Sequence, residues 1–488
     1  MEDEPNHRCR RWLLVIALVG SACAATESTD SPAPVSTAIA PAATTAVVPA
    51  SSLSEPVRST VELPAMGAAE EEWRAVFETT GLRPNILATS TTLVVATIRA
   101  VIAFDLRDGA ERWRLPATSN GWTSALSDQL RGRELFVVLG PGEVGAVDIE
   151  SGEIRWRNRV ANDGICTSLG APVVSDQQVF LARSCTFRNS AEVIALAAAS
   201  GAVLWRHEIE GAEDDAITAP ALVTAEMVVV RATIGARSGK HEETYVALDR
   251  RTGALRWQST LPVHPENQMA ALRSPRLVGD VIVVDEAGRS DLRRAAGLDA
   301  RTGELRWRSN VAAAEVVGDI VVGSDARRKA AQESPAVLAV SASTGNELWR
   351  IDGVVQARRA LNEAAPLILA ADQHILGVDP RTGSTMWRAP LDPFEFSNPP
   401  LFISAQSIDD RAMVLVRTST GVQNRSLTVV QPLDIFSGAA GRATKLDLFT
   451  LATIAIADGG AAVVGRVNRP ELPSSYAGWA IALKYSMN

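Results

Sequence analysis

The stretch that decides the fold of this chain is Ala103-Phe104-Asp105-Leu106-Arg107-Asp108-Gly109-Ala110-Glu111-Arg112-Trp113. Its frame is an Asp, a Gly four residues later and a Trp four residues after the Gly. An Asp that opens a tight turn accepts hydrogen bonds from the backbone N–H groups that follow it, and a Gly supplies the positive φ that closes a hairpin. The stretch therefore predicts a strand that reverses into a second strand carrying the Trp.

The same frame recurs along the chain. Full copies stand at Asp148, Gly152 and Trp156, at Asp249, Gly253 and Trp257, at Asp299, Gly303 and Trp307, and at Asp379, Gly383 and Trp387. Two copies keep Gly201 with Trp205 and Gly345 with Trp349 but have Ala197 and Ser341 in place of the Asp, and another keeps Asp434 and Gly438 but has Arg442 in place of the Trp. Successive Trp residues of the copies lie 38 to 52 residues apart, the length of four short strands with their loops.

Apolar runs precede each turn and complete the unit. Before the Asp249 turn lie Met227-Val228-Val229-Val230 and Tyr245-Val246-Ala247-Leu248, both typical of strands. The Trp on the outer strand can insert its indole between neighbouring sheets. A single sheet cannot cover its own faces, so we expect the sheets to pack radially. The sequence thus predicts an all-β fold, a β-propeller of four-stranded blades in which the Asp, Gly and Trp residues of the repeat are structural.

These repeats closely resemble the tryptophan-docking motif Ala-x-Asp-x-x-x-Gly-x-x-x-Trp of pyrroloquinoline-quinone-dependent alcohol dehydrogenases. The motif also marks a noncatalytic relative, the propeller lipoprotein of the outer-membrane β-barrel assembly machinery. The resemblance covers about residues 70 to 487 and implies eight blades. A literal count gives nine sheets, so we predict eight and treat the weak unit between 390 and 450 as an elaboration. We expect Glu72–Phe77 to pair with three strand-like runs in 451–487 and to close the propeller.

The N-terminal part predicts export. Residues 7–11, His-Arg-Cys-Arg-Arg, form a basic region and residues 12–19 are apolar, as in a signal peptide. Gly20-Ser21-Ala22-Cys23 resembles a bacterial lipobox, in which Cys23 would be lipidated. A larger aliphatic residue is usual where Gly20 stands, so ordinary cleavage at Ala22-Cys23-Ala24 is the alternative. We expect a signal peptide over 1–23, a disordered Ala/Thr/Ser/Pro-rich linker over 24–66 and the propeller domain over 67–488.

Two cysteines, Cys166 and Cys185, lie in the predicted propeller. Between them, two apolar runs flank a Ser175-Asp176 turn. If the turn is centred between these two residues, antiparallel pairing places Cys166 opposite Cys185. Because a disulfide persists outside the cytoplasm, we predict one between them. Two free buried thiols, with a bulge breaking the register, are the alternative.

Charge and motifs exclude several functions. The formal net charge is −8 and the sequence has no run of five or more basic residues, so we expect no nucleic-acid partner. The histidines, at 7, 207, 241, 264 and 374, do not form a ligand pair, and His241-Glu242-Glu243 is interpreted as a solvated loop. The Arg residues beside the Trp residues are interpreted as partners of Glu111, Glu153, Glu304 and Glu347 on the outer rim. We expect no catalytic residue, no metal and no cofactor.

Three classes of function are compatible with a propeller of this kind: a scaffold, a quinone-dependent dehydrogenase and a ligand-sensing ectodomain. A quinone-dependent dehydrogenase is the alternative, but catalytic relatives usually carry an adjacent Cys pair near the quinone, and this sequence has no such pair. A ligand-sensing ectodomain would normally need a second domain. We therefore expect a monomeric, noncatalytic scaffold, secreted across the cytoplasmic membrane. A lipid anchor would tether it at the outer face of a membrane in the cell envelope or periplasm, where it would bind other envelope or secreted proteins.

Overall fold

The computed structural model describes residues 70–484 except 80–84, 98–99, 117–124, 128, 141, 161–167, 186–189, 213–219, 235–241, 263–274, 287–293, 326–335, 359–364, 372–373, 391–401, 408–411, 421–425, 440–443, 447–449, 458–459 and 468–475. Nowhere in these ranges does the chain form a helix able to span a membrane.

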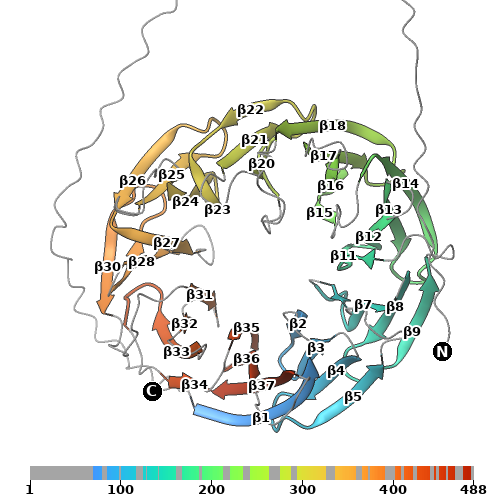
Figure 1. Cartoon of the computed structure of the whole chain (residues 1–488), viewed down its shortest axis with the longest axis horizontal. Helices are drawn as coiled ribbons and strands as arrows, with labels where there is room; N and C mark the ends of the chain where they lie inside the picture. Colours follow the sequence, from blue (N-terminus) through green and yellow to red (C-terminus); the bar gives the residue numbers. More distant parts are fainter. Residues whose placement is uncertain are drawn as a thin grey trace, which may run out of the picture. The chain divides into compact units, whose positions relative to one another are not determined.

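The described residues form antiparallel sheets that follow one another in chain order (Figure 1). The first three are β2–β5 (Asn85–Ala88, Thr92–Ala96, Ala100–Asp105, Glu111–Pro116), β6–β9 (Ala125–Leu126, Glu134–Gly140, Glu143–Asp148, Ile154–Arg159) and β10–β14 (Ser168–Leu169, Val173–Ser175, Gln178–Cys185, Ser190–Ala197, Val203–Glu210). The next three are β15–β18 (Pro220–Val223, Met227–Ile234, Glu242–Asp249, Leu255–Pro262), β19–β22 (Arg276–Val278, Val281–Glu286, Arg294–Asp299, Leu305–Arg308) and β23–β26 (Val311–Val317, Ile320–Asp325, Ala336–Ser341, Glu347–Asp352). The last are β27–β30 (Val354–Arg358, Leu367–Ala371, His374–Val378, Thr385–Pro390), β31–β34 (Phe402–Ser407, Ala412–Thr420, Ser426–Asp434, Thr444–Leu446) and β35–β37 (Thr450–Ala457, Gly460–Val467, Tyr476–Lys484) with β1 (Glu70–Thr79).

Inner and outer strands differ in burial. Every residue of β3 and β4 is buried, whereas in the outer strand β5 only Trp113 is buried. A strand covered on both faces needs apolar residues at successive positions, and a strand at the rim needs them on one face only. This difference explains why the Val-rich runs of the sequence do not alternate with polar residues.

The hydrophobic core lies between consecutive sheets. On β16, Val228 and Val230 pack in a cluster with Trp205 of the preceding sheet. Val229, which points to the other face, packs in a cluster with Trp257 and with Ile282 of the following sheet. Adjacent residues of one strand thus contribute to two different cores, so each sheet is stabilised by both of its neighbours.

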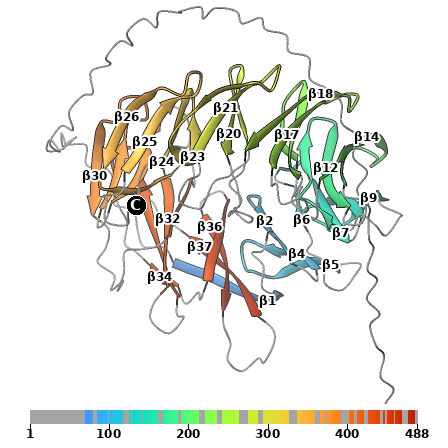
Figure 2. The ribbon, with the colours of Figure 1, turned by 45° about the horizontal axis from the view of Figure 1, so that its top comes forward.

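The two ends of the described chain meet in one sheet. β1 pairs antiparallel with β37, with Arg74 opposite Ile481 and Phe77 opposite Gly478. Figure 2 shows the blue strand β1 beside the red strand β37. The predicted pairing of Glu72–Phe77 with the C-terminal runs matches this sheet, which would otherwise end in an unpaired edge at β37.

The described residues form nine sheets, the number that a literal count of the sequence gave, whereas we predicted eight blades from the resembled families. The additional sheet is β31–β34, the region that we had treated as an elaboration. Its turn keeps the backbone geometry of the repeat, because Gly438 has a φ of 71° and its N–H donates to the carbonyl of Asp434 at 2.9 Å. Because Arg442 replaces the Trp, the sequence motif of this copy is incomplete although its turn has the same backbone conformation as the others.

The hairpin between β11 and β12 corrects the register used for the cysteines. Val174 pairs with Val179 and Ser175 with Gln178, so the turn is centred after Asp176, which has a positive φ of 52°. Farther out, Leu169 pairs with Arg183. The predicted register was therefore wrong by two positions near the turn and by one beyond it. Cys166 lies outside the described residues, and the disulfide stays a prediction.

Candidate functional site

The repeat turn closes on its Asp and Gly. In the turn between β17 and β18, the N–H of Gly253 donates to the carbonyl of Asp249 at 2.8 Å, and Gly253 has a φ of 73°. One carboxylate oxygen of Asp249 accepts the backbone N–H groups of Arg251 and Thr252 at 3.1 and 3.0 Å. The Asp therefore satisfies donors that a tight turn leaves without partners.

The Gly of each turn also contacts the Trp of the preceding sheet, a constraint that the sequence analysis missed. A Cβ atom placed on Gly253 would lie 2.6 Å from Cε3 of Trp205, too close for any side chain. The same contact joins the pairs Trp73 and Gly109, Trp113 and Gly152, Trp156 and Gly201, Trp257 and Gly303, Trp307 and Gly345, Trp349 and Gly383, and Trp387 and Gly438. The Gly is thus required for packing as well as for its backbone conformation.

The indole N–H of each Trp that contacts a turn Gly donates to a backbone carbonyl in the next sheet. Trp205 Nε1 lies 2.9 Å from the carbonyl oxygen of Arg250, the residue that follows the repeat Asp. The equivalent bonds, of 2.7 to 3.0 Å, join Trp73 to Leu106, Trp113 to Ile149, Trp156 to Ala198, Trp257 to Ala300, Trp307 to Ala342, Trp349 to Pro380 and Trp387 to Ile435. The Trp residues therefore hold consecutive sheets together by packing and by a directed hydrogen bond.

The Arg that precedes the Trp binds the repeat Asp. Arg256 lies 2.8 Å from Asp249, and Arg306 lies 2.5 Å from Asp299. Arg112 and Arg155 bind Asp105 and Asp148 in the same way. Arg114 pairs with Glu111 as expected, but these other arginines use the Asp of the turn and not the nearby Glu residues that we had assigned to them.

These ion pairs change the acidity of the repeat Asp. The hydrogen bond from Arg306, followed by the backbone N–H of Thr302, lowers the pKa of Asp299 to about 2. The hydrogen bond from Arg256 lowers the pKa of Asp249 well below its usual range. Both carboxylates are therefore ionised at neutral pH, and their charge is used inside the repeat.

A buried polar cluster lies where we had interpreted a solvated loop. Glu243 is on β17 and is only 2% exposed, with Arg231 Nε 2.6 Å from its carboxylate. The Tyr245 hydroxyl lies 3.1 Å from the same carboxylate, and burial followed by the charge of Glu243 raises the pKa of Tyr245 well above its usual value. The alternation of Glu243 and Tyr245 on one face of the strand was the available signal, because β17 begins earlier than the apolar run suggested.

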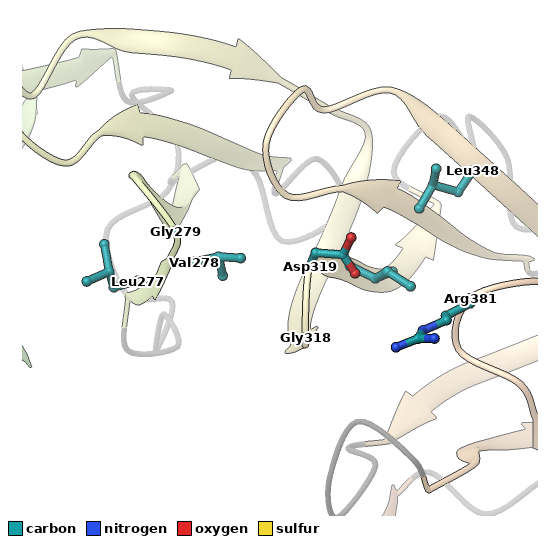
Figure 3. Close-up of a pocket in the computed structure, with 8 residues that line it drawn as sticks. Leu277, Val278, Gly279, Gly318, Asp319, Leu348 and Arg381 are labelled. Atoms are coloured by element: carbon teal, nitrogen blue, oxygen red, sulfur yellow. The ribbon is translucent and has the colours of Figure 1, made fainter.

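The turns at one end of three consecutive sheets line a pocket of about 690 Å³ (Figure 3). Leu277 and Gly279 come from the β19–β20 hairpin, Asp319 from the β23–β24 turn, Leu348 from β26 and Arg381 from the β29–β30 turn. In Figure 3 the guanidinium of Arg381 points toward the turn that carries Asp319. Leu277 and Leu348 are 40% and 47% exposed, so both charged and apolar groups face this pocket.

The remaining sequence candidates do not form a site in the described part of the chain. Cys23 and Cys166 lie outside the described residues, and Cys185 ends β12. Within the described ranges, no group of three or more His, Cys, Asp or Glu side chains is placed to hold a metal ion. His374 lies 3.0 Å from Arg388, and the pKa of this histidine is lowered, first by burial and then by the charge of Arg388.

Comparison with solved structures gives likenesses at low sequence identity. The structure of BamB from Moraxella catarrhalis is 16% identical and aligns over 70% of this chain and 96% of its own, with a TM-score of 0.43. Quinohemoprotein alcohol dehydrogenase from Comamonas testosteroni is 13% identical over 85% of this chain and 76% of its own, with a TM-score of 0.48. A eukaryotic initiation factor is 13% identical over 76% of this chain and 90% of its own, with a TM-score of 0.50. At such identities a likeness concerns the fold alone.

Sequence comparison identifies the family. No curated protein sequence matches the chain. The family model described as outer membrane protein assembly factor BamB matches residues 66–185, 167–321 and 293–432, which together span most of the chain. The repeated four-stranded antiparallel sheets of the chain match those of propeller structures. The chain therefore belongs to the PQQ-like β-propeller repeat family of the outer membrane protein assembly factor BamB.

Proposed function

We propose that this protein is an extracytoplasmic, membrane-tethered scaffold that binds other proteins of the cell envelope and catalyses no reaction. In this proposal the lipid on Cys23 and the linker over 24–66 hold the folded domain near a membrane. The family contributes the expectation of a role in envelope assembly, because the matching model is named for an outer membrane assembly factor.

One observation carries the proposal: the chemically distinctive residues of the repeat are occupied within the fold. The indole N–H groups bind backbone carbonyls of the next sheet, as Trp205 binds Arg250. The repeat carboxylates bind turn N–H groups and arginines, as Asp299 binds Arg306. Groups with such partners are not available to a substrate, which supports a structural use of the repeat and leaves the surface turns as the variable, binding part of the protein.

We further propose that the nine sheets are nine blades of one propeller, closed where β1 pairs with β37. Trp73 on β1 supports this arrangement, since its indole donates to Leu106 of the β2–β5 sheet as the other Trp residues donate to their neighbours. The terminal sheet then joins the first and last strands of the domain. Closure of this kind removes open edges and makes a rigid platform for partners.

A quinone cofactor is the alternative for this chain, because alcohol dehydrogenases share the repeat. Such a quinone is held with a calcium ion, which prefers six to eight oxygen ligands. The described residues do not gather a carboxylate set for this ion.

Photo-crosslinking in intact cells tests the scaffold. The sequence contains four Lys residues, so amine-reactive reagents suit it poorly. A photoreactive amino acid is therefore placed singly at Leu204, Leu255 or Leu348, which are exposed on outer strands. We expect the same envelope proteins to be captured from cells that express the full chain, in an irradiation-dependent manner. Capture of no protein at any position would contradict the scaffold, and dye-linked alcohol oxidation by the purified chain would contradict the absence of catalysis.

A further inference from the structure

The pocket beside Asp319 lies at a sheet whose charged residues differ from those of the two preceding sheets. In two preceding sheets an acidic residue comes directly before the second strand, Glu226 before β16 and Asp280 before β20. Their carbonyls accept the N–H groups of Arg250 and Ala300, each the residue after the repeat Asp, at 2.9 Å. These acids therefore occupy equivalent places in the two sheets.

Each of these two acids forms an ion pair with an arginine on the outer strand of its own sheet. Arg256 lies 3.3 Å from Glu226, and Arg306 lies 2.6 Å from Asp280. Each arginine also binds the repeat Asp of its own sheet, so one guanidinium links two carboxylates. The guanidinium is planar and has five donors, which suits this bridging arrangement.

The β23–β26 sheet keeps the acid but lacks the arginine. Asp319 precedes β24, and its carbonyl accepts the N–H of Ala342 at 2.8 Å, so it is the equivalent of Asp280. Leu348 stands directly before Trp349, the place held by Arg256 and Arg306 before their Trp residues. Among the described residues, Asp319 has no ion-pair partner, and the same holds for Arg381, which also lines the pocket.

We propose that this pocket binds an arginine side chain that an envelope protein presents with an acidic residue close to it. The guanidinium takes the place beside Asp319 that Arg306 takes beside Asp280. The methylene stem of the ligand arginine packs on Leu348, and the neighbouring carboxylate binds Arg381. Pairing of opposite charges at both ends fixes the direction of the bound segment. This inference names a binding site for the scaffold and rests on the proposed function.

Fluorescence anisotropy with the purified folded chain tests the site. The probe is a labelled hexapeptide, Ala-Leu-Arg-Ala-Asp-Ala, and the comparison peptide carries citrulline, a neutral isostere, in place of arginine. We expect the arginine peptide to bind about tenfold more tightly, because one charge-assisted contact of ~1.4 kcal/mol corresponds to a factor of ten. Equal binding of the two peptides, or no binding of either, would overturn the inference.

Two variants locate the binding. Leu348→Arg supplies an internal guanidinium to Asp319, as Arg306 does to Asp280, so it should abolish binding of the peptide while the domain stays folded. Asp319→Asn should lower the affinity for the arginine peptide to that for the citrulline peptide. Leu305→Arg is the matched control, since Leu305 is exposed on β22 and does not line the pocket, and it should bind as the unaltered chain does.

The results separate this site from the scaffold proposal. Unchanged binding by Leu348→Arg would overturn the assignment of the pocket. If partners are still crosslinked in cells when the peptide does not bind, the scaffold stands and uses another surface. If peptide binding follows the expected pattern but no partner is crosslinked, the pocket stands and the proposed cellular role fails.

Discussion

Trp205 and Arg250 belong to different sheets, and the indole N–H of the first donates to the backbone carbonyl of the second at 2.9 Å. The carbonyl follows a repeat position, so its place does not depend on the side chain of Arg250. Ala300 and Pro380 accept the equivalent bonds from Trp257 and Trp349. The contact between sheets is therefore set by backbone geometry, which explains why the residue after the Asp varies among the repeats while the Trp recurs.

Replacement of a docking Trp should destabilise the whole domain. Trp257 is 6% exposed and belongs to the core between the β15–β18 and β19–β22 sheets. Trp257→Ala should lower the free energy of unfolding by about 3–5 kcal/mol, the usual loss for a large buried aromatic side chain. Urea denaturation measures this change. Leu255→Ala is the control, because Leu255 is 52% exposed on the same strand and should change stability little. Similar effects of the two variants would show that the indole is misplaced.

The two requirements on the repeat glycine can be separated. Gly253 has a φ of 73° and contacts Trp205, whereas Gly279 has a φ of 58° with nothing within 4 Å of an added Cβ. Gly279→Ala should lower the free energy of unfolding by about 1–2 kcal/mol, because alanine is disfavoured in a left-handed backbone conformation. Gly253→Ala should lose more, because the methyl group also displaces the indole. Equal losses in thermal unfolding would mean that the contact with Trp205 adds nothing to the constraint.

Stability should decline in acid because of the ion pairs of the turns. The pKa of Asp299 is lowered to about 2, so the unfolded chain, with an ordinary Asp pKa of about 3.9, binds more protons between these values. The stabilising contribution is complete above pH ~4 and is lost as the pH falls toward 2. Asp299→Asn and Arg306→Leu should flatten this dependence in denaturant titrations. Arg301→Leu alters an exposed arginine of the same turn and should leave the slope unchanged.

The repeat predicted the order of the strands because its residues act through local geometry. Asp249 and Gly253 are four residues apart in sequence and are hydrogen-bonded to each other, so their spacing reports the turn directly. A literal count of the sequence gave nine sheets, but we predicted eight because the copy at Asp434 has Arg442 in place of the Trp and because the families that the chain resembles have eight blades. The β31–β34 sheet shows that a turn can keep its conformation without a docking Trp.

Contacts between residues that are distant in the sequence could not be predicted, for a different reason. The burial of Glu243 depends on Arg231 of the neighbouring strand, and no local spacing connects these residues. The pocket depends on Asp319, Leu348 and Arg381, which come from two sheets. That Leu348 stands where the neighbouring repeats have an arginine is visible only when the repeats are aligned. That Asp319 therefore lacks an ion-pair partner is visible only in the structure.

The predicted disulfide needs a direct test, because the register that suggested it has changed. On the observed register Leu169 is opposite Arg183, and Cys185 lies two residues beyond Arg183 on the same strand. We still expect Cys166 to reach Cys185 after export, since an oxidising compartment favours the bond. Non-reducing mass spectrometry of exported protein should detect one joined peptide. Its absence, with both thiols alkylated in the unfolded chain, would leave two free cysteines.

The tether makes the last prediction. If Cys23 is lipidated, the exported protein stays with the membrane fraction at high salt and leaves it only in detergent, because an acyl chain is held by apolar burial and not by charge. Labelled fatty acid should be incorporated into the chain, and Cys23→Ser should release the protein in soluble form with its thermal unfolding unchanged. Limited proteolysis should give the same soluble core by cutting before about residue 65, since polar linkers are cleaved first. Incorporation of label into Cys23→Ser would place the lipid elsewhere, and a soluble unaltered chain without label would favour ordinary cleavage next to Ala22.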